Sequence, residues 1–181
     1  MRGREPAASA ATTDGLAQLC TFRVGGEDYA IDIMRVREII NPLPVTPVPR
    51  APAFVEGVIR LRGDVIPVVD VRRRLGLAVT APTRKTKTLI VHVAGRRLGL
   101  VVDEVTEVLR IPRSEIRPSP GLVEAGGARF FLGVCGGDNA SAGRRGASRL
   151  RLLLNVRALL EPVSPGEVEA ARSEAETTRH T

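Results

Sequence analysis

Apolar and polar residues alternate along most of this chain in short runs of the kind that form β-strands, with turn residues between the runs. The clearest example is Gly57 to Leu75, GVIRLRGDVIPVVDVRRRL. Two apolar runs flank a corner, Leu61-Arg62-Gly63, where glycine supplies the positive φ that a tight turn requires. Asp70 stands where an N-cap would begin one helical turn, and Gly76 stands where that turn would end. This stretch predicts a strand, a corner, a second strand and a capped helical turn.

The residues before this stretch predict a hairpin and then an irregular segment. Strand-like runs at 19–24 and 29–33 are separated by the turn sequence Gly25-Gly26-Glu27-Asp28. Within 35–40, regular alternation fails, so a bend, bulge or helical turn is expected. Five prolines between 41 and 52 exclude a helix or a central strand and predict a stiff, extended connection.

A polar linker at 78–87 leads to a second set of predicted strands. These strands are expected at 88–93, 97–102, 105–111 and 150–154, and Asn155 is expected to cap a second helical turn that ends at Leu160. Residues 138–148 read as a turn-rich loop. Residues 1–18 are expected to form a flexible N-terminal tail, 19–162 the folded domain, and 163–181 a tail or a short helix that begins near Ser164.

The two halves of the chain resemble each other. Phe22–Ile40 aligns without gaps with Val91–Leu109 at a shift of 69 residues, with apolar residues facing apolar residues and a turn glycine facing a turn glycine. The shift becomes 76 where Gly57 meets Gly133, and 85 where residues 65–75 meet residues 150–160. Shared glycines and caps favour an internal duplication over chance similarity between β-rich segments.

The duplication predicts an all-β fold. Each copy holds about five short strands, which give too little core for a stable domain alone. We therefore expect two closed or nearly closed small barrels that bury their facing sides against each other, with a groove between them. The lobes would cover approximately 19–80 and 88–162, with strand exchange possible.

Composition narrows the function classes. The 181 residues are 43% hydrophobic, which is enough for a core, and carry a net charge of +7 with a pI near 10.8. A polyanion partner is therefore a hypothesis, and the alternative function is that of a basic nucleic-acid-binding β-barrel protein. Aromatic residues make up only 3% of the chain, which disfavours single-strand stacking, and the basic residues are scattered.

The chain shows no signal peptide and no apolar run near the roughly 20 residues of a membrane span, which predicts a cytoplasmic protein without direct membrane insertion. Cys20 and Cys135 lie in apolar strand-like runs and are expected to be buried and reduced.

The titratable residues do not suggest an enzyme. With only His92 and His180, neither a metal cluster nor a Ser-His-Asp arrangement around paired histidines is indicated, and no cofactor is expected. Asp103-Glu104 and Glu107 are near enough in sequence for acid–base work, but charges on the solvent side of a strand explain them better.

The basic clusters are read as solvated charges beside turns. They are Arg72-Arg73-Arg74, Arg84-Lys85-Lys87, Arg96-Arg97 and Arg144-Arg145. Arg62 differs because it stands in a corner between apolar strands, where it should seek a carboxylate, and Glu38 is the hypothesis. Whether this pair is structural or is offered to a partner stays open at this point.

Four ordered motifs resemble those of the CheW-type chemotaxis coupling proteins. They are YAIDIMRVREII, VPRAPAFVEGVIRLRGDVIPVVDVRRRLGL, LGLVVDEVTEVLRIP and LLLNVRALL, and the resemblance runs from about Leu19 to Leu160. It implies two intertwined five-stranded SH3-like barrels without enzymatic activity. It also implies a scaffold that bridges the cytoplasmic tips of methyl-accepting chemoreceptors to the regulatory domain of the histidine kinase CheA.

The resemblance also implies two sets of partner-binding residues. The receptor-binding groove would involve Ile33, Val36, Glu38, Val105 and Val108. The kinase-binding end of the first barrel would involve Pro44, Glu56, Gly57, Arg62 and Gly63. Ordinary core packing is the competing interpretation for the four apolar residues of the first set, and which face serves which partner stays open.

Two features depart from the family pattern. Arg60 replaces the usual Asn before the corner, and the Arg-rich insertion at 144–149 is untypical. Both bear on the identity of the partners more than on the fold.

Overall fold

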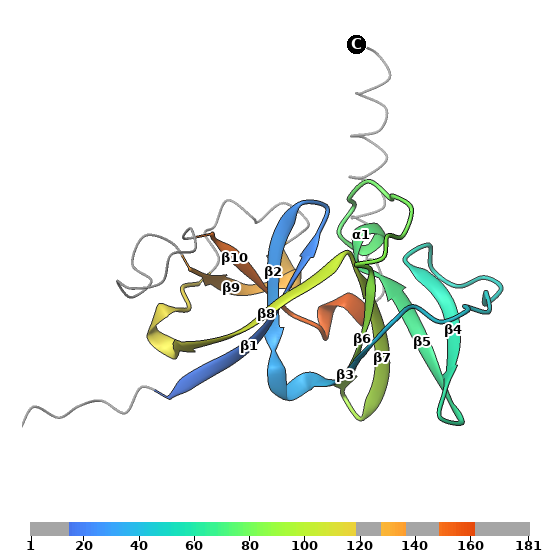
Figure 1. The fold of residues 1–181 in the computed structure, drawn as a ribbon, viewed down its shortest axis with the longest axis horizontal. Coiled ribbons are helices and arrows are strands. Elements are labelled where there is room, and N and C mark those ends of the chain that lie inside the picture. The colour runs from blue at the N-terminus through green and yellow to red at the C-terminus, as the bar shows by residue number, and fades with distance from the viewer. Residues whose placement is uncertain (1–14, 119–127, 137–148, 162–181) are drawn as a thin grey trace, which may run out of the picture.

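The computed structural model describes residues 15–118, 128–136 and 149–161 of the chain (Figure 1). The strands of this part are β1 (Leu16–Val24), β2 (Glu27–Asp32), β3 (Val36–Ile40), β4 (Val55–Leu61), β5 (Asp64–Asp70), β6 (Lys87–Val93), β7 (Arg96–Val102), β8 (Glu104–Pro112), β9 (Phe131–Cys135) and β10 (Arg151–Leu154). The helical elements are α1 (Val71–Arg74) and the 3-10 turns η1 (Ile33–Arg35), η2 (Arg113–Glu115), η4 (Ala128–Phe130) and η5 (Ala158–Leu160).

The strands form two five-stranded sheets, which lie side by side in Figure 1. The first sheet has the order β8-β1-β2-β10-β9, and the second has the order β3-β6-β7-β5-β4. Neighbouring strands are antiparallel except for β2 with β10 and β5 with β7, which are parallel. The predicted all-β fold is confirmed.

The duplication explains why the two sheets have the same order. The sequence alignment pairs β1 with β6, β2 with β7, β3 with β8, β4 with β9 and β5 with β10. Each sheet takes its central hairpin from one copy and its other three strands from the other copy. The two copies are therefore intertwined, and the sequence segments 19–80 and 88–162 do not coincide with the two sheets.

The chain leaving one edge strand of each sheet pairs with the opposite edge strand. After β3, Thr46 exchanges two backbone hydrogen bonds with Val58 of β4, at 2.8 and 2.9 Å. After β8, Arg117 does the same with Val134 of β9, at 2.9 and 2.8 Å. Each sheet therefore curls so that its edges approach each other, and full closure into SH3-like barrels stays a prediction.

One glycine permits this approach in each copy. A Cβ on Gly57 would lie 2.2 Å from the carbonyl oxygen of Thr46, and a Cβ on Gly133 would lie 2.4 Å from that of Arg117. Gly57 and Gly133, which align in the sequence repeat, therefore have the same structural role. Only a residue without a side chain lets the chain after β3 lie against β4, and the chain after β8 lie against β9.

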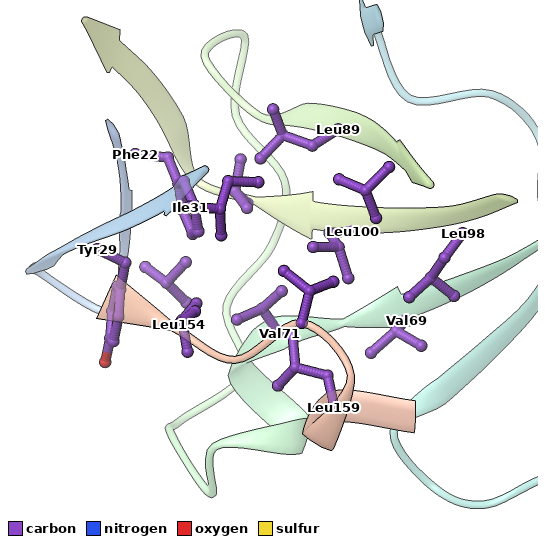
Figure 2. Packing of buried hydrophobic residues seen from close by; sticks show 14 of the residues in the cluster. Phe22, Tyr29, Ile31, Val69, Val71, Leu89, Leu98, Leu100, Leu154 and Leu159 are labelled. Atoms are coloured by element: carbon purple, nitrogen blue, oxygen red, sulfur yellow. The ribbon is translucent and has the colours of Figure 1, made fainter. Parts of the chain in front are cut away.

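A large hydrophobic cluster joins the two sheets (Figure 2). Phe22 and Ile31 enter it from the first sheet, and Leu89 and Leu100 enter it from the second. A smaller cluster fills the other face of each sheet, around Leu153 in the first sheet and around residues 59, 66, 68 and 90 in the second. Because both faces of the central strands are buried, these strands read as near-continuous apolar runs.

The two cysteines belong to these clusters. Cys20 and Cys135 are free thiols and are buried, as expected, and burial raises the pKa of both.

Most of the local predictions are confirmed. The irregular segment at 35–40 contains both a helical turn, η1, and a bulge in β3 between Val36 and Glu38. The Asp70 carboxylate caps α1 by accepting hydrogen bonds from the backbone N–H groups of Arg72 and Arg73, at 2.8 and 3.3 Å.

Two local predictions are wrong. Asn155 does not cap a helical turn: η5 begins at Ala158 without a side-chain cap, and the Asn155 amide instead donates to the carbonyl oxygen of Arg129 at 3.3 Å. The expected tail at 1–18 ends too late, because β1 already begins at Leu16 and pairs there with Pro112 of β8. The predicted loop at 138–148 and the predicted helix near Ser164 lie outside the described residues.

Candidate functional site

The corner between β4 and β5 places Arg62 beside Glu38. Arg62 and Gly63 have φ values of 51° and 88°, typical of a two-residue hairpin turn with both residues in the left-handed region. An Arg62 Nη2 hydrogen donates to Oε2 of Glu38 on β3 across 2.9 Å. The hypothesis that Arg62 pairs with Glu38 is confirmed. The left-handed conformation costs a non-glycine residue about 1 kcal/mol, so the turn holds an arginine where glycine or asparagine fits the backbone better.

A second ion pair involves Asp64, which follows Arg62 by two positions in the chain. Arg97 of β7 donates through Nη2 to Oδ2 of Asp64, the first residue of β5. Beside both pairs is a pocket of about 360 Å³ that is open to solvent. We call it the mouth pocket, and it is lined by Arg37, Glu38, His92, Gly95 and Arg97.

Glu56 and Gly57 lie near the other end of β4. Glu56 falls in a bulge between Val55 and Gly57, and its pKa is raised by burial and by the negative charge of Asp70, while Arg73 acts in the opposite direction. Gly57 has a φ of 148° and is covered by Thr46, as described above. Gly57 thus has a structural role whether or not a partner contacts it.

The structure does not bring the kinase set into one compact site. Glu56 and Arg62 are six positions apart along β4 and its turn, a span of about 20 Å in extended chain. Pro44 is exposed on the connection before β4, between half-buried residues 43 and 45. Arg62, assigned to the kinase set, instead contacts Glu38 of the receptor set.

The receptor set divides into packed and exposed residues. Ile33, Val36 and Val105 are half-buried and pack against the central cluster, which agrees with the competing interpretation of core packing. Val108 on β8 is 54% exposed. Glu38 has 26% of its side chain exposed, so both residues can reach a partner.

The sequence repeat reveals an apolar surface residue that the motif comparison missed. Ile39 on β3 aligns with Val108 on β8 and is 44% exposed. Since β3 and β8 are the equivalent edge strands of the two sheets, each copy exposes an apolar side chain at the same place. The alignment of 39 with 108 was the signal that could have identified Ile39.

The basic run 72–74 is not a solvated charge run, contrary to expectation. Arg72 binds both oxygens of Asp103, through Nε at 2.7 Å and Nη2 at 2.6 Å, and this pairing raises the pKa of Arg72. Arg73 pairs with Asp70 at 3.3 Å. Each of these two guanidinium groups is matched to a carboxylate.

Arg74 is buried, with an exposed fraction of 7%. It donates through Nε to the carbonyl oxygen of Leu159 at 3.0 Å and through Nη2 to that of Ala158 at 3.1 Å. Its guanidinium carbon lies 4.1 Å from the ring centroid of Phe54 and 4.8 Å from that of Phe130. Arg74 therefore joins the end of the first copy to the end of the second, a role that the run of arginines concealed.

The acidic residues considered for catalysis are engaged in ion pairs. Asp103 binds Arg72 and also accepts the backbone N–H of Gly25 at 2.8 Å. Lys85 and Arg23 both donate to Glu104, and an Nη2 hydrogen of Arg151 donates to Glu107 at 3.0 Å. This pattern fits structural charges better than an acid–base pair.

Within the described ranges, no three His, Cys, Asp or Glu side chains are grouped as a metal site would require. No helix in that part of the chain is long and apolar enough to cross a membrane.

These features define a class of protein, a duplicated all-β scaffold with two related, intertwined sheets. The family model of the CheW-like domain matches residues 18–163. The chain belongs to the CheW-like family, whose members are scaffold proteins and not enzymes.

Individual relatives agree with the family match. Chemotaxis protein CheW of Rhizobium meliloti (strain 1021) is 41% identical over 122 residues, which cover 67% of this chain and 79% of that protein. Protein FrzA of Myxococcus xanthus is 37% identical over 114 residues, covering 62% of this chain and 70% of that protein. The crystal structure of scaffolding protein TtCheW from Thermoanaerobacter tengcongensis superposes with a TM-score of 0.72 at 26% identity, covering 86% of this chain and 94% of that chain.

Proposed function

We propose that this chain is a non-catalytic, cytoplasmic adaptor that couples the tips of chemoreceptors to a CheA-type histidine kinase. The main support is the match to the CheW-like family over residues 18–163, together with the duplicated two-sheet fold. The adaptor would act by positioning: preformed surfaces hold receptor and kinase in a fixed relation, so that receptor state reaches the kinase through geometry.

The proposed receptor surface follows the β3 and β8 edges. It contains Glu38 and Val108, to which the structure adds Ile39 as an exposed apolar neighbour of Glu38. Ile33, Val36 and Val105 would shape this surface from beneath, because they pack against the central cluster.

The proposed kinase surface follows the β4–β5 hairpin and the connection before it. Arg62 and Gly63 form its tip, and Pro44, Glu56 and Gly57 lie toward its base. The contact between Arg62 and Glu38 would place the two surfaces next to each other, so that a change at one is felt at the other.

The nucleic-acid alternative has less support. Arg23, Arg72 and Arg97 each pair with a carboxylate, so these basic groups are not available as a continuous track for phosphates.

Co-purification tests the proposed function. Tagged full-length chain is mixed with the CheA-type kinase and the receptor cytoplasmic fragment of the same organism, and the retained proteins are quantified. We expect both to be retained with folded chain and neither with heat-unfolded chain. Failure to retain the kinase, together with nucleic-acid binding that falls steeply with salt, would favour the alternative.

A further inference from the structure

The mouth pocket carries an excess of positive charge that the fold does not neutralise. Arg62 is matched to Glu38, and Arg97 is matched to Asp64. Arg37, which lines the same pocket, is exposed and has no hydrogen bond or ion pair within the described ranges. The pocket lining and its two ion-pair partners together hold three guanidinium groups and two carboxylates, and the guanidinium group without a carboxylate is that of Arg37.

The lining favours an anionic group over an apolar one. Its five residues include two arginines, a histidine and a glutamate, whereas pockets for drug-sized ligands are mostly apolar. A Cβ built on Gly95 would meet no atom within 4 Å, so the wall formed by the β6–β7 turn leaves free space. The pocket can therefore admit a side chain from outside without rearrangement.

We propose that the mouth pocket receives a carboxylate side chain from an acidic segment of a bound protein partner. The planar guanidinium of Arg37 matches a carboxylate in a two-point contact, with Arg97 and His92 as further donors. Glu38 does not repel this carboxylate strongly, because its own charge is compensated by Arg62 at 2.9 Å. The inference deepens the proposed function, since the pocket includes Glu38 of the proposed receptor surface.

An acidic protein segment fits better than free phosphate. The chain around the pocket comes from β3 and from the β6–β7 hairpin, and no helix N-terminus points into it. The pocket therefore lacks the helix-terminal N–H groups that commonly bind phosphate, and its cationic groups are side chains, which also suit a carboxylate.

The test uses full-length, isotopically labelled chain titrated with a capped hexaglutamate peptide and followed by amide chemical shifts. We expect the largest saturating shifts at Arg37, His92, Gly95 and Arg97. Arg37→Ser should weaken binding about fivefold, the loss of one exposed charge pair. Arg96→Ser is the matched control, because Arg96 is an exposed neighbour that does not line the pocket, and it should change the affinity by less than about twofold.

Three outcomes would overturn the inference: equal weakening by the two variants, shifts spread evenly over the basic surface, or inorganic phosphate binding at the same residues as tightly as the peptide. The titration needs neither receptor nor kinase. If the peptide binds as expected but co-purification fails, only the proposed function falls; if co-purification succeeds without peptide binding in the pocket, only this inference falls.

Discussion

Arg62 and Glu38, which stand 24 residues apart in the chain, meet across 2.9 Å at the rim of the second sheet. The pair joins the tip of the β4–β5 hairpin to β3, the opposite edge strand of the same sheet. Arg62 keeps 76% of its side chain exposed, so the contact adds at most about 1 kcal/mol to folding. Under the proposed function, the pair lies between the two proposed surfaces, so we expect it to contribute more to partner recognition than to folding stability.

Reversing the charge of Arg62 should separate its role in partner recognition from its role in folding stability. We expect Arg62→Glu to abolish kinase activation in a reconstituted mixture of receptor and kinase, because it places two carboxylates together, while the melting temperature changes little. Arg62→Asn suits the left-handed turn and should be at least as stable as the original chain. The double variant Glu38→Arg with Arg62→Glu restores the pair, and partial recovery of activation would show that the pair itself matters. Unchanged activation with Arg62→Glu would remove Arg62 from the proposed site.

Substitution of Gly57 should destabilise the fold. In Gly57→Ala the new Cβ would lie 2.2 Å from the Thr46 carbonyl oxygen, so the connection must move away from β4. We expect a loss of about 2 kcal/mol or more in the free energy of unfolding, measured by urea denaturation. Gly95→Ala is the control, because Gly95 also has positive φ, at 78°, but has open space around it and should lose only about 1 kcal/mol. Equal losses would mean that the close approach of Thr46 contributes nothing.

Arg74 should contribute more to stability than its neighbour Arg73. Arg74→Met leaves the carbonyl oxygens of Ala158 and Leu159 without their buried donor, so we expect a loss of about 3 kcal/mol. Arg73→Met removes a half-exposed ion pair and should cost less than about 1 kcal/mol. Denaturation midpoints of the two variants provide the comparison, and a similar effect of both would contradict the structural role of Arg74.

Glu56 should make stability depend on pH. Because burial and Asp70 raise its pKa, the folded chain holds this proton more tightly than the unfolded chain does. Its contribution therefore favours folding below the ordinary glutamate pKa and is lost as pH rises through the higher pKa of the folded state. Glu56→Gln should gain stability relative to the original chain at pH 7 and show no such gain at acid pH.

Denaturation curves at several pH values check the Glu56 prediction. Glu27→Gln, at an exposed position in β2, controls for the general effect of removing one negative charge. The prediction would be contradicted if the difference in unfolding free energy between Glu56→Gln and the original chain did not change with pH.

Much of the local structure could be predicted from the residues alone. The Asp70 cap, the β4–β5 corner and the bulged segment at 35–40 depend on nearby residues and backbone preferences. The alignment of Gly57 with Gly133 was used as evidence for the duplication, and the structure shows that both glycines permit a close approach of another backbone segment.

The candidate site was only partly predictable. The residue types at Arg62 and Glu38 led to the right pair, since an arginine between apolar strands requires a carboxylate. The prediction of a solvated charge run at 72–74 was wrong, because nothing in three adjacent arginines distinguishes the buried Arg74 from its two neighbours. The spacing of Val71, Arg74 and Leu75 on one helical face was the available signal that Arg74 points inward.

Most strands, the turns and the duplication could be predicted from the residues, because hydrophobic alternation, glycine conformations and caps act over short distances. The exchange of strands between the two copies could not be predicted in this way, because either copy could in principle pair with itself. The parallel contacts of β2 with β10 and β5 with β7 join segments far apart in the chain. In the second sheet, the pairing of β3 with β6 brings Arg37 and Arg97 to one pocket, and Arg62 lies beside it through its ion pair with Glu38. Long-range pairing is selected by the joint burial of a common core, which no short stretch of sequence encodes.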